Sequence, residues 1–128
     1  MTSPGVNKIL VAIKENLIST GLDSVLRREN CTPYHTDSAE GTIHHLGMFP
    51  DTGLVIISME IALENNARVF EYIKEMRHTL PVILISRYLT VETIRIARML
   101  NCSEILQDRM NPAIMRAILT KYIQNHSP

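Results

Sequence analysis

Hydrophobic positions in this chain form two patterns, short uninterrupted apolar runs and longer stretches with helical spacing. The clearest run covers residues 54–57, four large aliphatic side chains that end at Ser58. A run without polar alternation is typical of a strand buried on both faces, as in a parallel sheet covered by helices. Residues 80–86 repeat this design, with a proline only near the beginning and Ser86 at the end. We therefore expect two central parallel strands that each end in a serine.

Weaker apolar runs predict three further strands, over residues 8–13, 31–36 and 103–107. The run 31–36 contains Pro33, and a proline has no N–H to donate to a neighbouring strand. We therefore expect this strand at an edge of the sheet.

Apolar residues spaced by three and four predict five helices between and after these strands. They are expected over residues 16–28, 37–48, 67–78, 91–100 and from 111 onwards. Candidate capping residues mark four of the starts, namely Asn16, Asp37, Thr90 and Asn111. In the last helix the expected inner face consists of Ile114, Ala117, Ile118 and Tyr122. Residues 60–66 are expected to form a loop.

Strands and helices that alternate in this way imply right-handed βαβ crossovers on a parallel sheet. The chain has 128 residues, a length that suits one domain with its own core, so we expect residues 1–128 to be a single domain. The pattern therefore predicts an α/β fold with a five-stranded parallel sheet between helical layers.

Composition narrows the function classes. Thirteen basic residues balance thirteen acidic ones and no dense Lys/Arg run occurs, which disfavours direct nucleic-acid binding. No apolar run approaches the ~18 residues of a membrane span and the N-terminus has no signal-peptide pattern, so we expect a cytoplasmic protein without membrane contact. Cys31 and Cys102 lack C-x-x-C spacing and are expected to be buried thiols. The histidines lack metal-ligand spacing, so no metal or other cofactor is expected.

The order, lengths and punctuation of the predicted elements over residues 8–124 resemble the receiver domain (CheY-like) of bacterial two-component response regulators. The resemblance implies a flavodoxin-like fold with strand order 2-1-3-4-5, which also places the proline-containing strand at an edge. An active receiver accepts a phosphoryl group from a histidine kinase on an aspartate that ends the third strand. An acidic pair after the first strand holds Mg²⁺, and a Ser/Thr and a Lys after the fourth and fifth strands bind the phosphoryl oxygens.

This chain departs from that pattern at most of the functional positions. The acidic pair falls on Ile13 and Lys14 with only Glu15 as a nearby acid, the acceptor falls on Ser58, and the lysine falls on Asp108. Ser86 alone keeps the expected Ser/Thr, and Asn65-Asn66 matches the Asp/Asn-Gly that starts the family's third helix. A serine hydroxyl without an adjacent base is a poor nucleophile, so neither aspartyl phosphorylation nor enzyme activity is expected.

Lys14 and Asp108 have exchanged the charges that the family carries at these two positions. One hypothesis is that they form an ion pair across the vacated pocket; the alternative is two solvated loop charges without contact. A rival register would make Glu60 the acceptor equivalent, if the strand 54–57 continues two residues beyond Ser58. Arg109 is a further candidate to replace the lysine, through a shift of one residue.

The resemblance and the departures together predict a pseudo-receiver, a two-component signalling module that acts through phosphorylation-independent protein contact. Its partner would be a sensor kinase, an output domain or a second copy, bound through the fourth helix, fifth strand and fifth helix. Basic residues in that segment are the candidate interface, namely Arg95, Arg98, Arg109, Arg116 and Lys121. Two alternatives are a small-ligand or nucleotide-binding regulatory domain that uses the vacated pocket, and the regulatory module of a longer DNA-binding or enzymatic regulator. The sequence has no Gly-rich phosphate-binding loop, which disfavours a nucleotide as the ligand.

Overall fold

A computed structural model describes residues 8–14 and 20–123 of the chain, and strands and helices alternate throughout these ranges. Both predicted serine-ended strands are present and fully buried, β3 (Leu54–Ser58) and β4 (Val82–Ser86). The other strands are β1 (Lys8–Ala12), β2 (Thr32–Thr36) and β5 (Glu104–Gln107). The helices are α1 (Thr20–Arg28), α2 (Ala39–Met48), α3 (Met59–Met76), α4 (Val91–Met99) and α5 (Pro112–Ile123).

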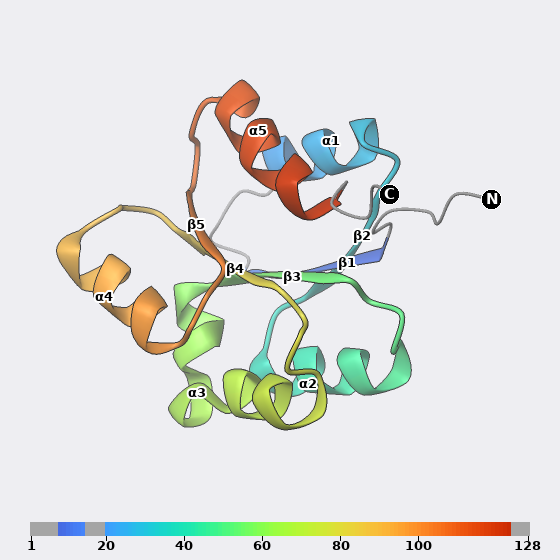
Figure 1. Cartoon of the computed structure of the whole chain (residues 1–128), viewed down its shortest axis with the longest axis vertical. Coiled ribbons are helices and arrows are strands. Elements are labelled where there is room, and N and C mark those ends of the chain that lie inside the picture. Colours follow the sequence, from blue (N-terminus) through green and yellow to red (C-terminus); the bar gives the residue numbers. More distant parts are fainter. Residues whose placement is uncertain (1–7, 15–19, 124–128) are drawn as a thin grey trace.

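All five strands are parallel, and their order in the sheet is β2-β1-β3-β4-β5. This order confirms the predicted flavodoxin-like fold, including the edge position of the proline-containing strand. Figure 1 shows the sheet edge-on in the middle of the molecule, with helices on both sides.

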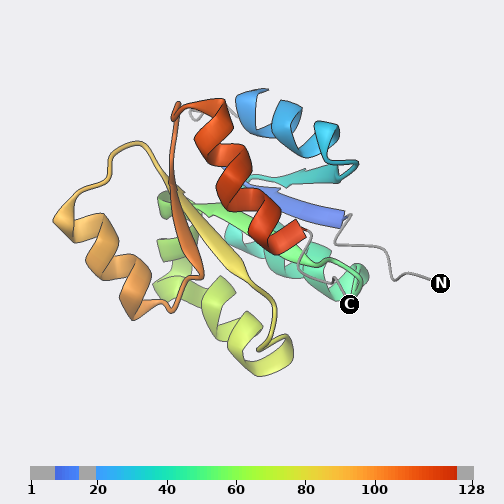
Figure 2. The same ribbon diagram turned by 45° about the horizontal axis from the view of Figure 1, so that its top comes forward.

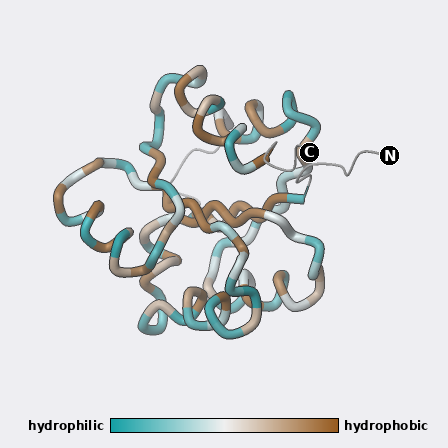
Figure 3. Tube along the Cα trace, in the orientation of Figure 1, coloured by the Kyte–Doolittle hydropathy of each residue, from teal (hydrophilic) through white to brown (hydrophobic). Residues whose placement is uncertain are grey.

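The sheet separates two apolar cores. On one face, alternate strand residues such as Val11 and Ile56 pack against α1 and α5, which lie side by side (Figure 2). On the other face, residues such as Leu10 and Ile57 pack against α2, α3 and α4. The central band of hydrophobic residues in Figure 3 is this sheet, so the carboxyl ends of its strands are held by burial on both faces.

Pro33 occupies a position in β2 where its missing N–H costs no sheet hydrogen bond. The Ile13 amide donates to the Thr36 carbonyl over 3.1 Å, so Thr36 faces β1. Backbone groups of successive strand residues point to opposite sides, and Pro33 and His35 therefore face away from β1. Pro33 therefore lies on the side of β2 that has no neighbouring strand, where no N–H is required.

The predicted caps of the last two helices are confirmed. The Thr90 side chain accepts a hydrogen bond from the Thr93 amide and the Thr93 hydroxyl accepts one from the Thr90 amide, which together form a capping box. The Ala113 amide donates to the Asn111 side chain over 2.8 Å, with Pro112 as the first helical residue.

Two predicted helix starts need comment. The prediction that Asp37 caps α2 was wrong, because Ser38 accepts the Gly41 amide over 2.9 Å and the helix begins at Ala39. Asn16, predicted to cap the first helix, lies outside the described residues.

The predicted loop over residues 60–66 was also wrong. Helix α3 begins at Met59, immediately after β3, and Ser58 is its N-cap. The helix is interrupted at residues 64–67, where Asn65, Asn66 and Ala67 have φ between 51° and 59°. Three consecutive left-handed residues break the helix and redirect it, and asparagine tolerates this conformation better than most residues do.

The predicted inner face of α5 is right for Ile118 and Tyr122, which pack against the core, and wrong for Ile114 and Ala117, which are exposed. Its buried residues are Met115, Leu119 and Ile123, whereas the side chain of Ile114 is 54% exposed. The helix is apolar on almost every side, so hydrophobic spacing alone could not select the face that meets α1.

The prediction of buried thiols is confirmed for Cys31, whereas Cys102 is only partly buried. Cys31 is buried, and Cys102 packs against the core between the sheet and α3, where burial raises the pKa of its thiol to about 12. Among residues 8–14 and 20–123, no three potential ligand side chains gather as a metal-binding group. In those same ranges no helix combines the length and apolar character that a membrane crossing requires.

Candidate functional site

The strand ends bring the predicted site positions to one edge of the sheet. Ala12 is paired with Ile57 and Ser58 with Ile85, so residue 13 and Ser58 leave β1 and β3 at the same level. Ser86 is paired with Gln107, and its carbonyl accepts the Asp108 amide over 2.7 Å. The carboxyl edge of an open α/β sheet is the usual place for a ligand or reaction site.

Ser58, at the acceptor position, is completely buried. Its backbone is extended, and its Oγ accepts the amide of Ile61 at 3.5 Å, the outer limit of a hydrogen bond. The hydroxyl therefore caps the first turn of α3, and its burial keeps it from solvent and from any reactant there. This arrangement gives Ser58 a structural role at the position where an active receiver holds its nucleophile.

Lys14, at the second acidic-pair position, forms an ion pair with Glu64, with 2.7 Å between Nζ and Oε2. The hypothesis of an ion pair between Lys14 and Asp108 was therefore wrong. The reason lies in α3: its break at residues 64–67 presents the Glu64 carboxylate to the end of β1. Within residues 8–14 and 20–123, Asp108 takes part in no ion pair.

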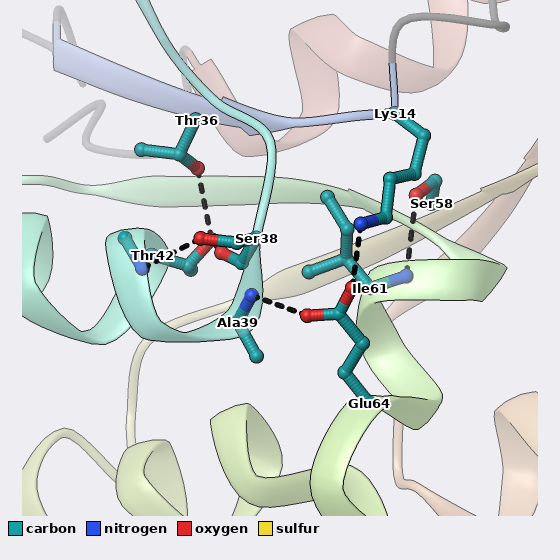
Figure 4. A network of polar contacts seen from close by, with 9 residues as sticks. Lys14, Thr36, Ser38, Ala39, Thr42, Ser58, Ile61 and Glu64 are labelled. Carbon is teal, nitrogen blue, oxygen red and sulfur yellow. Dashed lines mark hydrogen bonds and ion pairs between the residues drawn. The ribbon is translucent and has the colours of Figure 1, made fainter.

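Glu64 also binds the start of α2. Its Oε1 accepts the Ala39 amide over 2.7 Å, while Oε2 binds Lys14, so one carboxylate joins β1, α2 and α3 (Figure 4). The Lys14 ammonium and then the Ala39 amide hold the pKa of Glu64 below its ordinary value, and the carboxylate in turn raises the pKa of Lys14. An anion at a helix N-terminus is favoured by the unpaired amides there.

Two threonine hydroxyls and the Ser38 carbonyl form further hydrogen bonds on the β2 side. The Thr36 and Thr42 hydroxyls are 2.8 Å apart, and Thr42 also donates to the Ser38 carbonyl over 2.7 Å. Figure 4 shows these groups and the Glu64 carboxylate on either side of the α2 start. At the carboxyl ends of β2, β1 and β3, the polar groups named here are therefore bound to one another within the protein.

Ile13, Ser86 and Asp108 are also buried at this edge. The Ser86 hydroxyl donates to the Tyr88 carbonyl over 3.0 Å, which holds the loop that leads into α4. Ile13 packs into the core with α1. Glu15, the remaining acid near β1, lies outside the described residues.

The rival register that made Glu60 the acceptor equivalent was wrong, since β3 ends at Ser58. Glu60 is instead an exposed residue in the first turn of α3. Arg109 follows Asp108 with a left-handed φ of 67° and is exposed. Its substitution for the family's lysine stays a prediction.

The structure distributes the candidate interface residues over two faces. Arg116 binds Glu29 at the end of α1, so it faces α1. Lys121 binds Glu104 of β5, and Arg95 binds Glu92 within α4. Arg98 and Arg109 are exposed. These basic residues therefore do not form one continuous patch around α4.

Glu64 is the site residue that sequence reasoning missed. It stood in a predicted loop, and the two asparagines after it were the only hint of a special backbone there. A glutamate that precedes two asparagines is not specific enough to indicate a partner on β1 or α2. Hydroxyl residues Thr36, Ser38 and Thr42 were likewise without a recognisable motif.

No protein-family model matches this chain, and no curated protein matches it. Solved structures with the same fold are numerous. A response regulator receiver protein from Burkholderia phymatum has a TM-score of 0.76 at 14% identity, over 91% of this chain and 94% of that one. The non-phosphorylated HemR receiver domain from Leptospira biflexa has a TM-score of 0.75 at 14% identity, over 95% and 98%. The BeF3-activated DrrB receiver domain has a TM-score of 0.71 at 16% identity, over 95% and 97%.

The chain has the fold of a receiver domain. At these identities the likeness concerns the fold alone, and it covers nearly the whole length of both partners in each comparison. Function has to be argued from the residues at the carboxyl edge of the sheet.

Proposed function

We propose that this protein is a two-component-type signalling module that works without phosphorylation, through contact with another protein. The fold supports the first part of the proposal. The single observation that carries the second is Ser58, a buried helix cap at the position where an active receiver has its acceptor aspartate. Among residues 8–14 and 20–123 no base is hydrogen-bonded to this hydroxyl, and a capped, solvent-shielded hydroxyl without a base cannot take a phosphoryl group efficiently.

The residues present do not fit the Mg²⁺ ion that receivers use. Magnesium requires oxygen ligands, usually carboxylates, whereas the two equivalent positions here are Ile13 and Lys14. The Lys14 ammonium already neutralises Glu64, the described carboxylate that it contacts. A cation brought to this point would meet a positive charge in place of two negative ones.

The proposed partner surface consists of α4 and the loop before it, together with β5 and α5. Large apolar side chains are exposed in this region, namely Tyr88, Leu89, Val91, Ile94, Met99 and Ile114. Exposed apolar groups in a segment that also carries Arg95, Arg98, Arg109 and Lys121 suit contact with a protein partner. Arg116 belongs to the proposal less directly, because it faces α1.

An amide NMR titration tests the proposal. Mg²⁺ and then beryllofluoride, which imitates a phosphoryl group on a receiver aspartate, are added to the ¹⁵N-labelled chain. We expect no saturable shifts at Lys14, Ser58 or Ser86. The DrrB receiver domain, whose solved structure is BeF3-activated, is the positive control. Saturable shifts at these three residues would contradict the proposal.

A further inference from the structure

Two hollows meet at Asp108 and Arg109, beyond the ends of β4 and β5. The inner hollow, about 300 Å³, is walled mainly by apolar side chains, among them Leu22, Ile85 and Met115. The outer hollow, about 410 Å³, is lined by polar groups that include Arg87 and Gln107. Asp108 and Arg109 line both, so they stand at the boundary between an apolar and a polar space.

Asp108 brings a carboxylate to this boundary. The residue is only 8% exposed. Among residues 8–14 and 20–123, no hydrogen bond or ion pair of its carboxylate is found, although its backbone amide binds Ser86. The Asp108 oxygens are not among the buried unsatisfied atoms, so they open onto the hollows, where a cation could supply the missing counter-charge. The position therefore suits the ammonium group of a ligand.

Arg109 supplies the opposite charge a short distance along the same wall. It is exposed, and it belongs to no ion pair in the part of the chain that the structure describes. A guanidinium forms strong paired hydrogen bonds with a carboxylate. The wall thus carries complementary charges for a ligand with one ammonium and one carboxylate.

We propose that this double hollow binds a free α-amino acid with an apolar side chain. The side chain occupies the inner hollow between Leu22, Ile85 and Met115, the ammonium pairs with Asp108, and the carboxylate pairs with Arg109. An apolar amine lacks the group for Arg109, and a fatty acid lacks the group for Asp108. This binding site goes beyond the proposed protein-contact function and does not depend on it.

Amide NMR titration with L-leucine, L-methionine and L-phenylalanine tests this site in the ¹⁵N-labelled full chain. For a ligand this small we expect a Kd on the order of 1 mM for at least one of the three, with saturable shifts at Ile85, Asp108 and Met115. Two analogues of leucine separate the charges: isopentylamine, which has no carboxylate, and 4-methylpentanoate, which has no ammonium. Each is expected to bind at least about tenfold more weakly than L-leucine.

Two variants test the two halves of the site. Asp108→Asn keeps the shape of the side chain and removes its charge, so the Kd should rise about tenfold or more. Gly21→Leu narrows the inner hollow; a Cβ at Gly21 would meet no heavy atom within 4 Å, and loss of a helical glycine favours folding. Glu40→Gln, which removes an exposed carboxylate on α2, is the matched control and should bind like the unaltered chain.

The amino-acid site is overturned if none of the three ligands gives saturable shifts at concentrations up to about 10 mM. It is also overturned if Asp108→Asn binds as well as the Glu40→Gln control, or if 4-methylpentanoate binds as tightly as L-leucine. None of these results bears on Lys14 and Ser58, whose response to Mg²⁺ and beryllofluoride tests the proposed function separately.

Discussion

Strands β3 and β4 are neighbours with nearly the same sequence, and the chain treats their ends differently. Both are aliphatic, buried along their whole length and terminated by a serine. After Ser58 a helix begins at the next residue, with the serine as its cap. After Ser86 a four-residue loop intervenes, the serine hydroxyl holds that loop at Tyr88, and Thr90 caps the helix instead.

The difference shows that the residues after a buried strand decide what its last residue does. At β3 no other capping side chain is available near Met59. The buried Ser58 hydroxyl therefore accepts a hydrogen bond from the helix amide of Ile61. At β4 the Thr90–Thr93 capping box starts α4 on its own and leaves Ser86 for the loop. The same side chain at equivalent strand ends is therefore a cap in one place and a loop anchor in the other.

The largest expected effect tests whether the strands themselves are equivalent. Ile56 and Ile83 are paired across β3 and β4 and have no exposed surface. Ile56→Ala and Ile83→Ala should each lower the free energy of unfolding by about 2–5 kcal/mol, because each leaves a cavity in the same core. Urea unfolding measures both. Val91→Ala, at a side chain that is 85% exposed, is the control and should change little.

A difference of more than about 2 kcal/mol between the two isoleucine variants would show that the strands are not equivalent. The contrast between β3 and β4 would then begin in the sheet and not at the serines.

An intermediate effect distinguishes the two helix starts. Thr90→Ala removes the cap hydroxyl that accepts the Thr93 amide, so it should cost about 0.5–2 kcal/mol in urea unfolding. Ser58→Ala is the matched variant at β3. Because its hydrogen bond to Ile61 is at the 3.5 Å limit, its loss should be smaller. A larger loss at Ser58 would make the serine the stronger of the two caps.

The smallest expected effect concerns the contacts of the Glu64 carboxylate with Lys14 and with the Ala39 amide. Lys14 and the Ala39 amide lower the pKa of Glu64 from an ordinary value of about 4.5, so its contribution to stability is present above that value. It should be lost as the pH falls through the lowered pKa of the folded state. The stability difference between the unaltered chain and Glu64→Gln should therefore shrink from about pH 6 to about pH 3.

Unfolding in urea at several pH values measures this difference. Glu75→Gln, at an exposed carboxylate farther along α3, is the control and should show a smaller change. If the Glu64→Gln difference is independent of pH over this range, the carboxylate is not stabilised in the way that its contacts indicate.

Much of the fold could be predicted from the sequence because buried parallel strands leave an unmistakable signal. Uninterrupted aliphatic runs located β3 and β4, and the missing N–H of Pro33 identified an edge strand. The α5 face could be predicted only in part, because Ile114 and Met115 are equally apolar and only packing against α1 selects between them.

The site could be predicted only as a set of positions. The apolar run before it placed Ser58 at the carboxyl edge of the sheet, and the resemblance to receiver domains added Ile13 and Asp108. The partner of Lys14 could not be predicted, because it depends on the left-handed backbone after Glu64, which redirects α3. Local sequence carries little information about such a turn when alanine, Ala67, adopts it as well as asparagine.

The outward-facing proline in β2 has a consequence for how this protein meets other chains. A strand that approached this edge to extend the sheet would find no amide donor at Pro33. The next residue of β2 that faces such a strand is His35. Main-chain pairing along this side is thereby weakened at its centre, which protects the edge against uncontrolled growth of the sheet in the manner of native edge strands. At this edge, association is left to side chains.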